Sequence, residues 1–124
     1  MRNILIHEQS NELVNYLRVH RRSAGLTQEE LGRVIGYRSE GPVTRHERFE
    51  SVPPFLIALG YEILFQEPAG KIFIGLRETM EFGIEGRLAE FEEALRRGAG
   101  NGLASPATQR KIKWLEERRR TANK

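Results

Sequence analysis

Apolar side chains recur at helical spacing along most of the chain. Leu13 and Leu17 lie four residues apart between positions 11 and 23, whereas Asn15 and Arg18 are expected to face outward. This spacing is typical of a helix that buries one side. The sequence allows a short strand only at 3–6. The pattern therefore predicts an all-α protein whose first helix spans 11–23.

The clearest local signal lies between Gly25 and Gly36. Thr27 is followed three residues later by Glu30, which is the pattern of a capping box at a helix N-terminus. Gly25 suits the left-handed conformation that ends the preceding helix, and Gly36 can close the new one. A second helix of about two and a half turns is expected here.

A third, polar helix is expected after a short turn. Gly41 is its expected cap and Pro42 its first residue, since proline suits that position. The segment 43–49 is dense in arginine, and only Val43 and one side of His46 offer an apolar anchor. Neighbouring helices must therefore hold this segment in place.

Longer apolar segments follow. The segment 55–65 is apolar on most sides, so we expect a buried fourth helix. A helical run from 69 to 97 comes next. Gly83 is its expected kink or break, because glycine costs about 1 kcal/mol relative to alanine in a helix. The glycine-rich stretch 98–104 is typical of a flexible linker, and a last helix or tail occupies 105–124.

Charge is distributed unevenly around a net value of +3. Residues 51–95 carry three Arg or Lys against eight Asp or Glu, whereas residues 96–124 carry nine against two. Three interpretations of the basic segment 105–124 stay open: a solvated disordered end, a second contact to a nucleic-acid backbone, or a helix that binds a partner protein.

Composition removes several classes of function. The absence of cysteine excludes disulfides and thiolate zinc sites, and it suits a cytoplasmic protein. No apolar run is long enough to span a membrane. The three histidines lack the spacing of a metal site, and no carboxylate is paired with a nucleophile or a base. We therefore expect no enzyme, no cofactor, no metal and no membrane partner.

A capped helix, a turn and a short polar helix form the pattern of a helix-turn-helix, whose second helix enters the major groove of DNA. The outward side chains Thr44, Arg45 and Arg48 are then free to meet DNA. Arginine is the commonest reader of guanine, because its fork matches O6 and N7. Thr27 and Gln28 lie at a helix N-terminus, where free N–H groups favour a phosphate.

This pattern resembles the Cro/repressor-type helix-turn-helix family, also called Xre-like. The resemblance rests on Gly25-Leu26-Thr27-Gln28-Glu29-Glu30-Leu31, followed by Val43-Thr44-Arg45-His46-Glu47. It implies a five-helix, lambda-repressor-like domain over 11–76, preceded by an N-terminal arm at 1–10. A helical extension at 77–97 is then a candidate dimer interface.

The resemblance also implies roles for single residues. Arg45 is the expected base contact, and Gln28 is expected to touch a phosphate and also a base. Arg21 and Glu47 match an ion pair that ties the first helix to the recognition helix. The expected DNA-contacting residues are Thr27, Gln28, Arg38, Ser39, Glu40, Thr44, Arg45 and Arg48.

One feature departs from the family pattern. The turn between Gly36 and Val43 is one residue longer than usual, and it contains Glu40 where family members often carry polar base-reading residues. A carboxylate at this position can accept a hydrogen bond from N4 of cytosine, but beside phosphates its charge is unfavourable. Base specificity is therefore not transferable from the family.

We expect a sequence-specific regulator of transcription that binds double-stranded DNA, most simply as a repressor. Two-fold dimers that read half-sites about one helical turn apart are the usual arrangement, so we expect a homodimer, with the apolar-striped helix 72–95 as its interface. The alternative is an antitoxin-like or other protein-interaction module whose C-terminal helices bind a partner protein.

Overall fold

The computed structural model describes residues 14–99 and 104–123. Over these residues the chain is all-α, with seven helices and no strand. The segment 3–6 and the arm at 1–10 lie outside the described residues. The chain divides into two compact units, Met1–Glu81 and Phe82–Lys124. In the described residues no helix is both long and apolar enough to cross a membrane.

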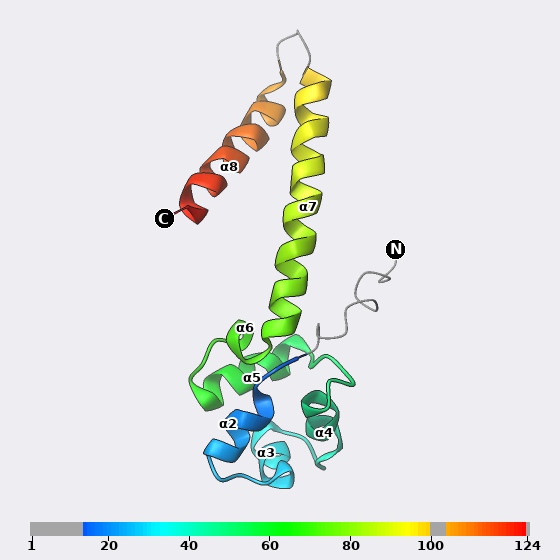
Figure 1. The fold of residues 1–124 in the computed structure, drawn as a ribbon, viewed down its shortest axis with the longest axis vertical. Helices are drawn as coiled ribbons and strands as arrows, with labels where there is room; N and C mark the ends of the chain where they lie inside the picture. The colour runs from blue at the N-terminus through cyan, green and yellow to red at the C-terminus, as the bar shows by residue number, and fades with distance from the viewer. Residues whose placement is uncertain (1–13, 100–103, 124) are drawn as a thin grey trace. The chain divides into compact units, whose positions relative to one another are not determined.

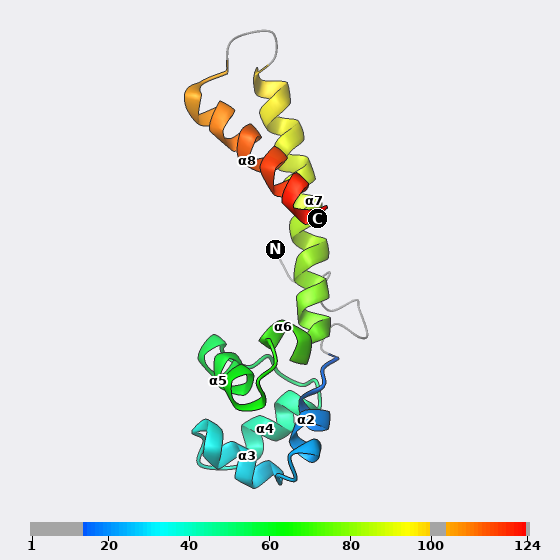
Figure 2. The same cartoon turned by 90° about the vertical axis from the view of Figure 1, so that its left-hand side faces the viewer.

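Five helices and the start of a sixth make up the first unit, and they cluster together in Figures 1 and 2. They are α2 (Leu17–Ser23), α3 (Gln28–Ile35), α4 (Gly41–Glu47), α5 (Phe55–Phe65), α6 (Ala69–Ile72) and the beginning of α7 (Ile74–Ala99). Their shared core consists of Leu17, Leu31, Val43, Tyr61, Ile72 and Phe73, all buried.

The first helix begins later than the sequence predicts. Residues 14–16 are not helical. The backbone N–H of Tyr16 donates to the carbonyl of Ile72 at 2.7 Å, and the carbonyl of Val14 accepts from the N–H of Gly75 at 3.0 Å. These long-range bonds use backbone groups that a longer α2 would need for itself, so the helix starts at Leu17.

The helix ends around the third helix follow the local signals. Thr27 Oγ1 accepts from the N–H of Glu30 at 3.0 Å, and Glu30 Oε1 accepts from the N–H of Thr27 at 2.9 Å. This confirms the capping box. Gly25 and Gly36 have φ of +77° and +114°, a conformation that glycine adopts without strain.

The turn into α4 differs from the prediction by one residue. Glu40 is the cap and Gly41 the first helical residue, so Pro42 lies second. The carbonyl oxygen of Ser39 in this turn lies 2.7 Å from the position that a Cβ atom on Gly32 would occupy. The turn can press against α3 in this way only because residue 32 has no side chain.

The prediction that α5 is buried is wrong. Only Tyr61 is fully buried in this helix, whereas Phe55, Leu56 and Ile63 are 78%, 76% and 75% exposed. Helix α5 contacts α3 and α6. Gly60 brings its backbone close to Ile35 on the α3 side. The elements packed against α5 cover only part of a helix that is apolar almost all round.

The predicted kink at Gly83 is also wrong. The chain breaks at Phe73 instead, between α6 and α7, and α7 then runs unbroken through Gly83 to Ala99. Phe73 is buried, and its ring lies 5.8 Å from that of Tyr61. Anchoring this aromatic ring in the core places the break. Gly98 of the predicted linker belongs to α7, and residues 100–103 lie outside the described ones.

The second unit consists of the later part of α7 and α8 (Pro106–Ala122). Both views show α8 running back alongside α7. Ser105 caps α8 by accepting from the N–H of Thr108 at 3.1 Å, and Leu115 is buried. A disordered end is therefore the wrong interpretation for the described part of the basic segment.

Gly32→Ala tests the contact between the turn and α3. Helix propensity alone would make this change favourable, whereas the contact with the Ser39 carbonyl should destabilise the chain by about 1–3 kcal/mol. Gly86→Ala is the control, because no atom lies within 4 Å of the added Cβ, and it should be neutral or stabilising. Urea unfolding followed by circular dichroism measures both. Equal stabilisation by the two changes would contradict the close approach.

Candidate nucleic-acid interface

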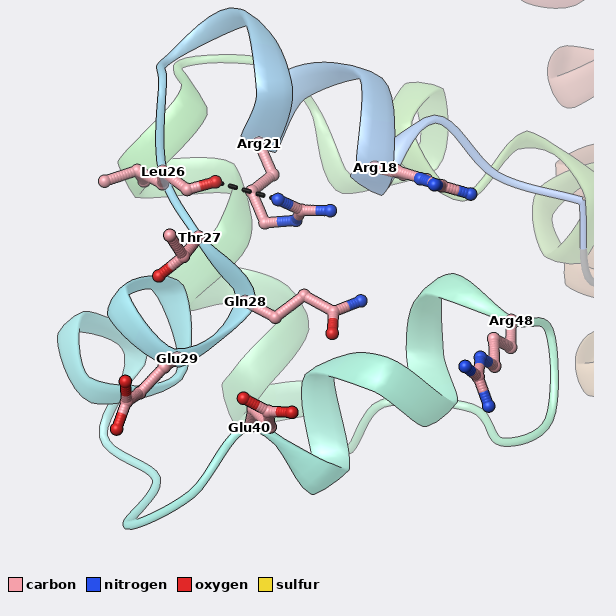
Figure 3. A pocket seen from close by; sticks show the side chains of 8 residues that line it. All are labelled: Arg18, Arg21, Leu26, Thr27, Gln28, Glu29, Glu40 and Arg48. Carbon is pink, nitrogen blue, oxygen red and sulfur yellow. Dashed lines mark hydrogen bonds between the residues drawn. The ribbon is translucent and has the colours of Figure 1, made fainter.

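A buried ion pair joins α2 to α4. Arg21 Nε lies 2.6 Å from Glu47 Oε2, and Arg21 Nη2 lies 3.2 Å from Glu47 Oε1. Both residues are buried. Arg21 Nη1 also donates to the carbonyl of Leu26 at 2.8 Å (Figure 3). Since a buried charge is stable only when it is paired and hydrogen-bonded, these contacts fix α2, the entry to α3, and α4 against one another.

Gln28 extends this network from the first turn of α3. Its Nε2 donates to Glu47 Oε1 at 3.0 Å, and its Oε1 accepts from Thr44 Oγ1 at 2.9 Å. One amide hydrogen and one oxygen lone pair remain for another partner. The side chain expected to touch a phosphate thus also spans α3 and α4 within the protein.

Helix α4 has one buried side and one exposed side. Val43, His46 and Glu47 are buried, whereas Arg45 and Arg48 are exposed. His46 Nδ1 lies 2.9 Å from the hydroxyl of Tyr61 on α5. Burial lowers the pKa of His46 below its usual 6.5, and the charge of Arg45 lowers it further. The imidazole is therefore mainly neutral at pH 7, as a core position requires.

An open hollow of about 600 Å³ lies beside this network. Gln28 extends toward it from α3, Arg18 lies on α2, and Arg48 lies at the end of α4 (Figure 3). Its lining residues are Arg18, Arg21, Leu26, Thr27, Gln28, Glu29, Glu40 and Arg48. The hollow thus brings together four of the eight residues predicted as DNA contacts, Thr27, Gln28, Glu40 and Arg48. The other four, Arg38, Ser39, Thr44 and Arg45, do not line it.

Cations without a partner give the hollow its chemistry. Arg18 and Arg48 form no ion pair within the described part of the chain, whereas Glu29 is paired with Arg33 at 3.1 Å. Glu40 is the acidic residue at the hollow that no ion pair neutralises there. A surface with two unpaired arginines can attract an anion such as a phosphate.

Arg18 is a site residue that the sequence analysis misses. Its side chain is exposed, as the helical pattern predicts, and it also lines the hollow. Arg18 and Arg21 are three residues apart, and residues at this spacing share one face of a helix. The partner of Arg21 was already predicted. The same three-residue spacing, counted back from Arg21, would have identified Arg18 as a residue on the same side of the helix.

The remaining predicted residues lie in or near the turn. Arg38, Ser39 and Glu40 are exposed just before α4. The guanidinium of Arg45 folds back toward the start of its own helix, where its Nη1 lies 3.4 Å from the position of a Cβ on Gly41. Among the described residues, no three His, Asp or Glu side chains form a group that could hold a metal ion.

No family model, curated protein or solved structure matches the chain. The resemblance to the Cro/repressor-type family therefore rests on its motif alone, and the family's functions enter below as proposals.

Glu47→Ala tests the buried pair. It leaves Arg21 buried without its anion and frees one end of Gln28, so we expect a loss of about 3–5 kcal/mol in the free energy of unfolding. Replacing both partners, with Arg21→Met and Glu47→Leu, should recover most of that loss. Glu29→Ala, which breaks an exposed pair, should cost less than about 1 kcal/mol. Urea unfolding compares the variants, and a double variant as unstable as Glu47→Ala would contradict this account.

Proposed function

We propose that the chain is a sequence-specific, double-stranded DNA-binding regulator of transcription, acting most simply as a repressor in the cytoplasm. The proposed fold of α2 to α6 is the five-helix, lambda-repressor-like helix-turn-helix domain, and the later part of α7 with α8 is its C-terminal extension. In this proposal α4 enters the major groove, and α3 lies across the DNA backbone.

The observation that carries the proposal is that the buried residues of α4 anchor the helix while its exposed residues are free cations. This helix has only seven residues, and its buried positions serve to anchor it. Its exposed side carries arginines that make no ion pair in the described residues, and it adjoins a hollow with a further unpaired arginine. The buried side of this short helix anchors it in the protein, and its exposed side carries unpaired arginines. This arrangement supports a role in contacting DNA bases.

Single residues receive roles from their positions. Arg45 is the proposed base reader, and Thr44 assists it while it holds Gln28. Glu40 is proposed to accept from cytosine N4. The proposed phosphate contacts are Arg18, Thr27, Gln28, Arg38, Ser39 and Arg48.

A second copy of the chain is the proposed partner of α7. At about 100° per residue, Ile84, Leu88 and Phe91 share one side of this helix, and Leu88 lies beside Leu115 of α8. Phe91 is 43% exposed. A unit of about 40 residues usually needs a disulfide, a metal or a partner chain for stability. The chain has no cysteine, and a dimer also suits two half-sites in DNA.

A protein-interaction module of the antitoxin-like kind is the second candidate. The observation that favours it is the amount of exposed apolar surface: besides Phe91, Phe82 on α7 and Trp114 on α8 are 74% and 51% exposed. A foreign protein could cover these side chains in place of a second copy. The two functions are compatible, because one surface would bind DNA and another the partner.

Arg45→Ala tests base reading. We expect it to lose discrimination at one base pair by about 1–3 kcal/mol, because its guanidinium fork is the proposed guanine contact. Arg48→Ala is the matched control: loss of a phosphate contact should weaken binding to all sequences alike and reduce the salt slope by about 1. Fluorescence anisotropy with a panel of duplexes measures both. An unchanged site preference in Arg45→Ala would overturn the assigned recognition helix, and no salt-sensitive affinity in the unaltered chain would overturn the proposed function.

Phe91→Glu tests the dimer. It places a charge in the proposed interface and should convert a dimer into a monomer in sedimentation velocity. Phe82→Glu is the control, because nine residues at about 100° each place it on the opposite side of α7, and it should leave the dimer intact. Full-length chain that is monomeric at high concentration would contradict the proposed interface.

A further inference from the structure

Charge is divided along α8 into a paired half and an unpaired half. In the C-terminal half each of three successive arginines faces a carboxylate: Arg118 pairs with Glu85 at 2.5 Å, Arg119 with Glu92 at 2.8 Å, and Arg120 with Glu117 at 3.9 Å. Hydrogen bonds from these arginines lower the pKa of Glu85 and hold that of Glu92 at about 2. The pairs of Arg118 with Glu85 and of Arg119 with Glu92 therefore persist at neutral pH and hold α8 on α7, whereas the pair of Arg120 with Glu117 lies within α8.

The N-terminal half of α8 has cations of a different kind. Arg110, Lys111 and Lys113 are exposed, and none of them forms an ion pair with a described residue. The sequence from 104 to 115 contains no Asp or Glu at all. Three positive charges thus gather within one turn of helix without local neutralisation.

The orientation of α8 sends two of these cations away from α7. Leu115 is buried against α7 and marks the inward side. At about 100° per residue, Arg110 and Lys113 point roughly 140° and 160° away from it, whereas Lys111 lies about 40° from it and is nevertheless exposed. Trp114 follows Arg110 by one turn and is 51% exposed. The outward face therefore combines free cations with an exposed aromatic ring.

We propose that this outward face of α8, formed by Arg110 and Lys113 with Trp114 beside them and extended by the exposed Lys111 at the flank of the helix, is a second DNA contact that binds the phosphate backbone without reading sequence. The inference rests on the proposed DNA-binding function. It assigns to α8 the sequence-independent part of the affinity, because each cation that neutralises a phosphate releases a counterion.

DNA fits this face better than the other polyanionic partners. An amphipathic helix that lies in a membrane surface needs a broad apolar face, but the apolar residues of α8 include Leu115, which is buried against α7. An acidic protein would need carboxylates matched to three particular cations. A phosphate backbone offers a continuous row of charges, which three long, unpaired side chains can meet in several registers.

The test uses the full chain with Arg110→Gln, Lys111→Gln and Lys113→Gln combined. Binding to mixed-sequence duplex DNA is measured over a series of salt concentrations. At about 0.9 per phosphate contact, the slope of log affinity against log salt should become shallower by about 2–3. The control combines Lys71→Gln, Arg87→Gln and Arg97→Gln, which removes the same charge from exposed positions elsewhere, and its slope should stay near that of the unaltered chain.

Trp114 supplies an independent readout, since it is the only tryptophan in the chain. Its emission should change when duplex DNA is added to the unaltered chain and should change much less in the triple variant. Circular dichroism checks that the variant keeps its helix content. Vesicles of phosphatidylserine and phosphatidylcholine serve as the competing anionic surface.

Different outcomes separate this inference from the function on which it rests. If the DNA affinity of the unaltered chain falls steeply with salt and the triple variant shows the same slope, the α8 contact is overturned and the proposed function stands. An equal reduction of the salt slope in the control variant would also overturn the α8 contact, because the loss of net charge would then explain both reductions. Vesicle binding that the triple variant abolishes, with its DNA slope unchanged, would assign the face to membranes instead. If the unaltered chain shows no salt-sensitive DNA affinity, the proposed function fails as well.

Discussion

The buried pair of Arg21 and Glu47 is the contact on which the first unit depends. Arg21 reaches from α2 both to Glu47 at the end of α4 and to the carbonyl of Leu26 before α3. Glu47 in turn accepts from Gln28 on α3. One ion pair and its hydrogen bonds thus set the positions of three helices. Because α4 has only Val43 and His46 as further anchors, the direction in which its exposed arginines point follows from this pair.

Features with a local cause could be predicted from the sequence. The capping box of Thr27 and Glu30 and the left-handed glycines at 25 and 36 depend on residues no more than a few positions apart. The Arg21–Glu47 pair is different, because its partners are 26 residues apart and no local rule joins them. Only the resemblance to a known family made that pair predictable, and the link from Thr44 to Gln28 was not predicted at all.

The errors arose where packing decides between alternatives of similar local energy. The apolar pattern of α5 indicates which side chains favour burial but not which neighbours exist to cover them, and Phe55 and Leu56 remain exposed. The low helix propensity of glycine alone favoured a break at Gly83. The burial of the Phe73 ring against Tyr61 placed it ten residues earlier, and ion pairs one turn apart, such as Arg96 with Glu92, support the long helix. Arg18 was missed because its importance lies in the hollow that the helices form together.

The most direct measurement is selection of bound sequences from a random pool of double-stranded DNA with the full-length chain. Recognition by a cationic α4 in a two-fold dimer predicts enrichment of one short motif, repeated as an inverted pair with centres about one helical turn, roughly 10 bp, apart. Recovery of a pool with no enriched motif would contradict sequence-specific recognition by α4.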